Sequence, residues 1–200
     1  MPSLVVLIPE STRKATGGDP HAKPTDEFAG ALPAKVRDQL YTLRAEVAAK
    51  WKNTAAKEGV MPAYLRYQGN MYRHIPREMW EKRKSGVEVL IASGLYGIVA
   101  SRDTVFAYPH SMAEETPPFG KLNRWWHDRG LPSVLAAYIA AVKPTLVVDL
   151  LSLEYREAVE GYADGLPKSA VKRIDFPGLG RASQPKRGEQ VASILWKGTL

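Results

Sequence analysis

Three short apolar runs stand out in the pattern of hydrophobic and polar positions, and each ends at a proline, a glycine turn or a polar cluster. They cover residues 3–9, 87–92 and 145–151, and β-branched residues are frequent in them. Runs of this length without a helical repeat are typical of strands buried on both faces. The sequence therefore predicts three buried strands, and residues 96–99 either continue the second strand or follow a new turn after Gly94.

Apolar residues with helical spacing lie between these runs. In residues 33–57 they recur every three or four positions, which places them on one face of a helix. Further helices are predicted over residues 77–84, 119–127, 133–142 and 152–162, and irregular segments over 11–24 and 62–76. Short buried strands separated by helices predict a single compact α/β domain over residues 1–200, with a mixed α+β arrangement as the alternative.

The C-terminal segment, residues 164–200, is richer in glycine, proline and basic residues and ends in an apolar element near 191–196. Residues 177–180 look like the hairpin of a helix-hairpin-helix, whose glycine N–H groups hold a DNA phosphate without reading sequence. A plain Pro-Gly turn with a solvated basic flank is the alternative, because Pro185 is expected to end a second helix early. The candidate nucleic-acid contacts here are Gly178, Gly180, Arg181, Lys186 and Arg187.

The composition narrows the classes of function. A net charge of +7 favours a polyanionic partner such as DNA or a nucleotide, although a basic solvated surface is the simpler explanation. Cysteine is absent, which excludes disulfides, thiolate nucleophiles and cysteine-based metal sites. None of the four histidines lies four residues from another, so we predict no metal and no cofactor.

No feature of the sequence indicates a membrane or an export signal. No apolar run approaches the roughly 20 residues of a membrane span. The apolar N-terminal stretch has no preceding basic residue and no small-residue cleavage site. We therefore expect a cytoplasmic protein without a membrane partner, and we favour a monomer.

The motif SGLYG, residues 93–97, follows the second predicted strand. Glycine allows another group to approach the backbone closely, and a strand-end turn exposes N–H groups and a hydroxyl that suit an anion. Ligands of open α/β sheets bind at the carboxyl ends of the strands. The alternative is a tight turn with its tyrosine packed in the core. The ligand-site candidates in this motif are Ser93, Gly94, Tyr96 and Gly97.

The segment RYQGNMY, residues 66–72, places two tyrosines around a glycine. Aromatic residues interleaved with arginine can stack bases and hold phosphates. Half-buried loop anchors are the more common explanation of such a pattern. The ligand-site candidates in this segment are Arg66, Tyr67, Gly69 and Tyr72.

Polar residues follow the third predicted strand. Ser152, Glu154 and Tyr155 begin a predicted helix, and a helix N-terminus after a strand suits an anion. Alternatively, Ser152 only caps the helix and Glu154 only complements its dipole. Asp149 ends the apolar run, so it must be paired or functional if it is buried.

A loop after the glycine turn carries Asp103, Tyr108 and His110. Histidine titrates near neutral pH and can act as an acid or base, although a lone histidine is more often a surface or core residue. If the protein is an enzyme, the catalytic candidates are Asp103, His110 and Glu154, and Tyr108 is a binding candidate.

Five segments, in order, resemble those of the YaaA-type peroxide-stress-resistance family over roughly residues 3–160. Residues 9–14, PESTRK, look like the family's opening proline-serine-lysine loop, which makes Lys14 a binding candidate. The other segments are residues 66–72, 93–97, 103–108 and 149–155. The sequence departs from the family at Pro109 and Ser111, where an arginine and a glutamate are replaced, and at the C-terminus, where a lysine-containing strand is not evident.

The resemblance implies an α/β fold with a positively charged cleft, and DNA binding under peroxide stress. The first hypothesis is therefore a DNA-binding protein of this type whose binding is independent of sequence. The alternative is a small enzyme of the hydrolase or glycosidase type that acts on a nucleotide or nucleoside in a pocket at the strand ends.

Overall fold

A five-stranded mixed sheet forms the centre of the structure, a computed structural model that describes residues 2–51 and 59–200. The strand order is β4-β3-β1-β6-β7, and every neighbouring pair is parallel except β3 with β4. The strands are β1 (Leu4–Pro9), β3 (Val87–Ser93), β4 (Gly97–Ala100), β6 (Leu146–Asp149) and β7 (Val171–Arg173). A second, two-stranded sheet pairs β2 (Met61–Pro62) with β5 (Thr104–Val105).

Strand β1 is the central strand, and all six of its residues are buried. Val6 lies opposite Val89 of β3 on one side and Val148 of β6 on the other. A parallel strand covered on both faces needs apolar residues at every position, which explains the continuous apolar run in the sequence. The three predicted strands and the α/β fold class are confirmed.

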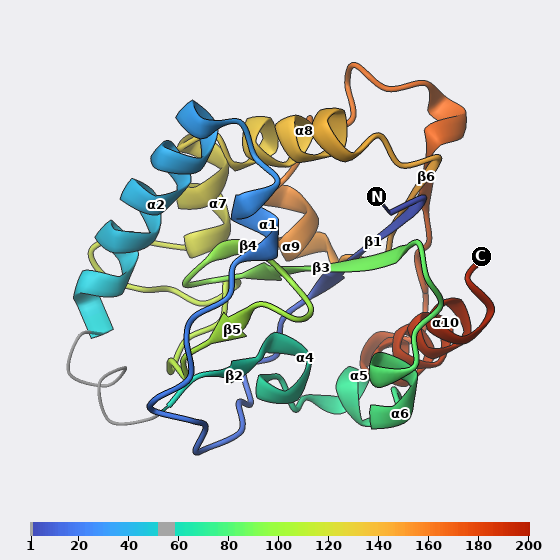
Figure 1. The fold of residues 1–200 in the computed structure, drawn as a ribbon, viewed down its shortest axis with the longest axis horizontal. Coiled ribbons are helices and arrows are strands. Elements are labelled where there is room, and N and C mark those ends of the chain that lie inside the picture. The colour runs from blue at the N-terminus through green and yellow to red at the C-terminus, as the bar shows by residue number, and fades with distance from the viewer. Residues whose placement is uncertain (1, 52–58) are drawn as a thin grey trace.

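Helices lie on both sides of the sheet (Figure 1). The first group comprises α1 (Glu27–Gly30), α2 (Ala34–Ala48), α7 (Leu122–Asp128), α8 (Leu131–Val142) and α9 (Leu153–Glu157). The second comprises α4 (Ala63–Arg66), α5 (Asn70–Arg73), α6 (Arg77–Glu81) and α10 (Ser183–Lys197). Helix α10 packs on α5 and α6, so the C-terminal end of the chain covers a segment that lies more than 100 residues earlier.

Several element boundaries differ from the predictions. Helix α2 ends at Ala48 and continues as the 3-10 helix η1 (Ala49–Trp51), and the rest of the predicted helix lies outside the described residues. Of the two alternatives predicted for residues 96–99, the new turn is the one observed, because residues 97–100 turn back as the antiparallel strand β4. Strand β7 was not predicted, because a Val-Lys-Arg edge strand has only one apolar residue.

The helix-hairpin-helix prediction for the C-terminal segment is wrong. Residues 171–173 form β7 and pair with β6, so a strand stands where the motif requires an α-helix before the Pro-Gly turn. The short 3-10 helices η2 (Lys168–Ala170) and η3 (Gly180–Ala182) flank this region. Pro185 does not end a helix early, because it lies in the first turn of α10, where its missing N–H is not needed.

Candidate functional site

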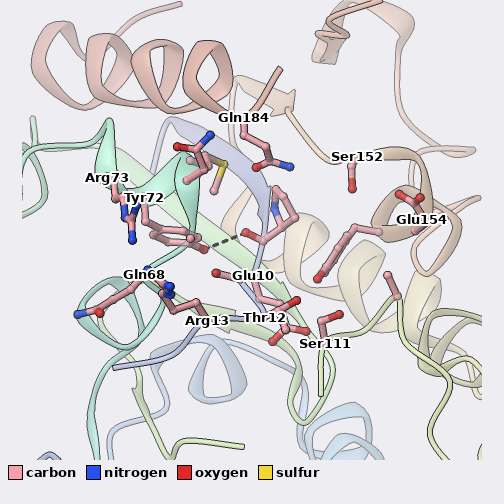
Figure 2. A pocket seen from close by; sticks show the side chains of 17 residues that line it. Glu10, Thr12, Arg13, Gln68, Tyr72, Arg73, Ser111, Ser152, Glu154 and Gln184 are labelled. Carbon is pink, nitrogen blue, oxygen red and sulfur yellow. Dashed lines mark hydrogen bonds between the residues drawn. The ribbon is translucent and has the colours of Figure 1, made fainter. Parts of the chain in front are cut away.

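A cavity of about 590 Å³ opens at the carboxyl ends of β1 and β6. Because these strands are parallel neighbours, the residues that follow them meet at one edge of the sheet. Figure 2 shows side chains from the β1 end, from α5, from α9 and from α10 surrounding this space. The walls are formed by residues 9–13, 68–73, Ser111, Ala113, Ser152, Glu154, Tyr155 and Gln184.

The outer part of the cavity, called the rim below, carries cationic and amide side chains. Its members are Arg13, Gln68, Asn70, Arg73 and Gln184. Both arginines are exposed, and within residues 2–51 and 59–200 neither forms an ion pair. The three amide side chains form no hydrogen bond with any described residue. The rim therefore presents two cations and three donor–acceptor groups whose capacity for binding is not used within the described chain.

A buried polar cluster, called the floor network below, lies at the inner end of the cavity. Its members are Glu10, Lys14, Tyr67, Ser93 and Tyr108. The Glu10 carboxylate accepts hydrogen bonds from the backbone N–H of Gly94 and of Met112, both at 2.7 Å, and from the Tyr108 hydroxyl. Glu10 thus joins the end of β1 to two segments that lie 84 and 102 residues later in the chain.

Lys14 is the cationic partner of Glu10. Its Nζ lies 3.5 Å from Glu10 Oε2 and 4.0 Å from the centre of the Tyr108 ring. It also donates to the backbone carbonyls of Ser11 at 3.0 Å and His110 at 3.2 Å. Burial raises the pKa of Glu10 and lowers the pKa of Lys14, and each charge opposes the shift of the other. Five polar contacts around two buried charges favour the ionised pair.

Three hydroxyls complete the floor network. Ser93 Oγ lies 2.7 Å from the Tyr108 hydroxyl and 3.1 Å from that of Tyr67, and the two tyrosine hydroxyls are 2.9 Å apart. Burial, with the Glu10 charge as the next cause, raises the pKa values of Tyr67 and Tyr108 well above their ordinary range. Both phenols therefore stay protonated and act as hydrogen-bond donors at physiological pH.

The glycines of residues 93–97 allow other parts of the protein to pack closely against the turn. A Cβ atom on Gly94 would lie 2.9 Å from the Met112 nitrogen and 3.1 Å from Glu10 Oε1. The Gly94 carbonyl accepts the indole N–H of the fully buried Trp126 at 2.8 Å. Gly97 has a φ of +70°, and its neighbours are Trp126 and Leu131. The close approach predicted at this turn is therefore made by the protein's own side chains.

The structure brings together many of the candidate residues. The floor network contains Lys14, Tyr67, Ser93 and Tyr108, and Gly94 contacts it. The cavity wall contains Gly69, Tyr72, Ser152, Glu154 and Tyr155. Tyr72 donates to the Pro9 carbonyl at 2.9 Å, as the dashed line in Figure 2 shows, and burial raises the pKa values of Tyr72 and Tyr155. Both tyrosines thus line the cavity as nearly buried side chains.

Other candidates lie away from the cavity. Asp103 accepts hydrogen bonds from the backbone N–H groups of Ala100, Glu27 and Phe28, so it joins the β4 end to the start of α1. Burial raises its pKa to about 7, against the effect of these hydrogen bonds. The Tyr96 hydroxyl oxygen accepts a hydrogen bond from the backbone N–H of Phe106 at 2.9 Å. His110 contributes its carbonyl to Lys14.

Arg66 is an interior residue with no exposed surface. Its guanidinium donates to the backbone carbonyls of Val105, Ala15, Gly17 and Gly59. These carbonyls belong to three segments that are distant in sequence. Arg66 therefore stabilises the fold around the second sheet and does not reach the cavity surface.

The basic residues of the C-terminal segment separate into different environments. Arg187 is buried on α10, where it donates to the Leu150 carbonyl and lies 5.3 Å from the Phe176 ring. Lys186 is paired with Glu189 at 2.9 Å. Gly178, Gly180 and Arg181 are exposed, as are the other residues of the turn. Gln184, which the sequence did not single out, is the residue of this segment that lines the cavity.

The sequence reasoning missed Glu10, although a usable signal was present. Glu10 directly follows a fully apolar strand, just as Asp149 ends one. Asp149 is fully buried and paired with Arg156 at 3.1 Å, as expected for a carboxylate in that position. The described residues contain no group of three or more histidine, aspartate or glutamate side chains arranged to hold a metal ion. Nor do they include a helix long and apolar enough to cross a membrane.

Comparison with known proteins places this chain in a family. Similar proteins include a UPF0246 protein from Streptococcus pyogenes serotype M5, 28% identical over 122 residues that cover 54% of this chain and 50% of the relative. A UPF0246 protein from Ruegeria sp. (strain TM1040) is 29% identical over 119 residues, covering 57% and 44%. The chain thus matches about half the length of these curated relatives. The family described as peroxide stress protein YaaA matches residues 24–178, and the chain belongs to this family.

Proposed function

We propose that the protein binds DNA without reading its sequence, through the rim of the cavity at the strand ends. The observation that carries this proposal is the pair of exposed arginines at the rim, Arg13 and Arg73, which form no ion pair within the described chain. A guanidinium fork matches the geometry of a phosphate and binds it with two parallel hydrogen bonds. The overall charge of +7 adds long-range attraction to a polyanion.

The family supports a role for this binding under peroxide stress. We propose that the protein acts as a cytoplasmic monomer, since one chain supplies every residue of the rim. Light scattering of the protein alone and with a short duplex measures the number of chains in the particle. A mass of two or more chains in the absence of DNA contradicts the monomer.

Fluorescence anisotropy with labelled duplexes of unrelated sequence tests the binding. We expect similar affinities for the different sequences and a steep loss of affinity as salt rises, because binding releases counterions from the phosphates. Arg13→Gln and Arg73→Gln should each weaken binding and reduce the slope of log K against log salt by about 0.9.

Arg37→Gln is the matched control, because Arg37 is a partly exposed arginine on α2, in the other group of helices. It should leave both the affinity and the salt slope close to those of the wild type. The proposal fails if no duplex binds at low salt, or if the rim variants and the control behave alike.

The floor network supports a second candidate, an enzyme that acts on a nucleotide or nucleoside. A carboxylate next to a lysine at the inner end of a cavity can exchange protons with a bound substrate. However, the side chains of Glu10 and Lys14 are 0% and 4% exposed, so a substrate in the cavity has almost no access to the two charged groups, although Glu10 belongs to the cavity wall. This closure is the reason that binding is the better supported function.

Chromatography of nucleosides and nucleotides after incubation with the protein distinguishes the two candidates. An enzyme releases free base or phosphate, and Glu10→Gln abolishes that release while DNA binding persists. If the wild type releases neither product from any nucleoside or nucleotide, the catalytic candidate is removed.

A further inference from the structure

The cavity has the dimensions and the lining of a site for one small polar molecule. Its volume of about 590 Å³ lies within the range of sites for single ligands. It is bounded by two tyrosines, Tyr72 and Tyr155, which are 6% and 7% exposed and therefore held in fixed positions. A DNA duplex that rests on the rim cannot enter such a space as a whole, whereas one nucleotide can.

The amides of the rim suit the edge of a nucleobase. Gln68, Asn70 and Gln184 each offer a donor and an acceptor, and none forms a hydrogen bond with the described residues. They come from different elements, namely the α4–α5 connection, α5 and α10, and all three residues line the cavity. Bases held outside a helix are recognised by hydrogen bonds to their edges and by contact with aromatic or apolar side chains. Phosphate binding alone does not require this set of groups.

An unusually exposed leucine lies beside the cavity. Leu153 is 78% exposed, more than any other large hydrophobic side chain among the described residues. Its neighbours Ser152 and Glu154 both line the cavity. At this exposure and this place, the Leu153 side chain is available to contact an apolar group of a ligand held at the cavity. Proteins that unstack DNA insert such side chains between bases.

We propose that the cavity receives a single nucleotide turned out of a DNA strand, and that Leu153 fills the gap that this nucleotide leaves in the stack. The proposal rests on the proposed function, because Arg13 and Arg73 hold the phosphates on the strand that supplies the nucleotide. The cost of unstacking is smallest where a base is unpaired or mismatched. The protein therefore prefers duplexes that contain an unpaired base over fully paired duplexes of the same length.

Duplexes with 2-aminopurine at one position test this directly, because the fluorescence of this base rises when it leaves the stack. Wild-type protein should raise the fluorescence severalfold, and affinity should be about tenfold higher when the 2-aminopurine is unpaired. Leu153→Ala should reduce the fluorescence rise in the paired duplex by at least half. Gln184→Ala should weaken binding of the unpaired duplex more than of the paired one.

Leu200→Ala is the matched control, because Leu200 is an exposed leucine that does not line the cavity. It should keep the full fluorescence rise. Binding of DNA with no change in fluorescence overturns this inference and leaves the proposed function intact. If Leu153→Ala shows the same fluorescence rise as wild type, the role of Leu153 is overturned. If the free 2-aminopurine nucleotide competes with an affinity equal to that of the duplex, the nucleotide need not be supplied by a DNA strand, and the inference is contradicted. Absence of DNA binding at low salt is instead the failure of the proposed function.

Discussion

The floor network reaches the cavity wall through Glu10, and the rim surrounds the same cavity, yet the polar groups of the two regions differ in whether they are paired. The floor pairs each charge and each hydroxyl inside the protein, and its Glu10 and Lys14 side chains are almost inaccessible to solvent. The rim leaves its arginines and amides without partners in the described chain. The difference follows from burial, because an unpaired charge is costly in the interior and tolerable in water. The floor therefore serves the fold, and the rim is available to a ligand.

Removing one charge from the floor is the strongest test of this contrast. Lys14→Met leaves the buried Glu10 carboxylate without its cation, so we expect a loss of about 3–5 kcal/mol in the free energy of unfolding. Urea denaturation measures this loss. The double variant Glu10→Gln with Lys14→Met should recover part of it, because no unpaired charge remains. Equal stability of Lys14→Met and wild type contradicts a structural role for the floor.

A methyl group at Gly94 tests the tight packing above Glu10. The Cβ atom of Gly94→Ala would lie 2.9 Å from the Met112 nitrogen, so the hydrogen bonds to Glu10 must shift. We expect a loss of about 1–3 kcal/mol, measured as a lower melting temperature. Gly30→Ala is the control, because no atom lies within 4 Å of its Cβ position, and it should not destabilise the protein. If both variants melt alike, the floor is less tightly packed than the structure indicates.

Asp103 is a buried carboxylate without a lysine partner, and its effect on stability should depend on pH. Its pKa rises from an ordinary value of 3.8 to about 7, so the folded state holds the proton more tightly than the unfolded state. The resulting stability is complete below pH 3.8 and is lost as the pH rises through about 7. Between pH 5 and 7, wild type should lose about 1.4 kcal/mol per pH unit relative to Asp103→Asn. A constant difference between the two proteins across this range contradicts the raised pKa.

Neutralising the rim should have the smallest effect on stability. Arg13→Gln and Arg73→Gln remove exposed side chains without partners in the described chain, so the free energy of unfolding should change by no more than about 0.5 kcal/mol. The same urea titrations measure this. A larger loss in either variant indicates that the arginine supports the fold, and then its effect on DNA binding cannot be interpreted as a lost phosphate contact.

Local pattern was sufficient for the main elements of the fold. The continuous apolar residues of β1 and the helical spacing in α2 each require one kind of structure to bury their side chains. It was not sufficient for β7 or for α10, because a short edge strand has little apolar signal and Pro185 is compatible with a first turn. The family motifs are local in the same sense, because each consists of residues that are close together in the sequence.

The sequence by itself determined the buried strands, the excess of positive charge and the presence of a glycine turn after β3. Only the tertiary structure decided that Arg66 supports the interior, that Asp103 joins β4 to α1, and that Glu10 joins segments 84 and 102 residues away. The physical reason is that burial and pairing depend on which distant segments meet. A charged residue has the same identity in the floor as in the rim, and its surroundings alone separate a structural contact from a group that can bind a ligand.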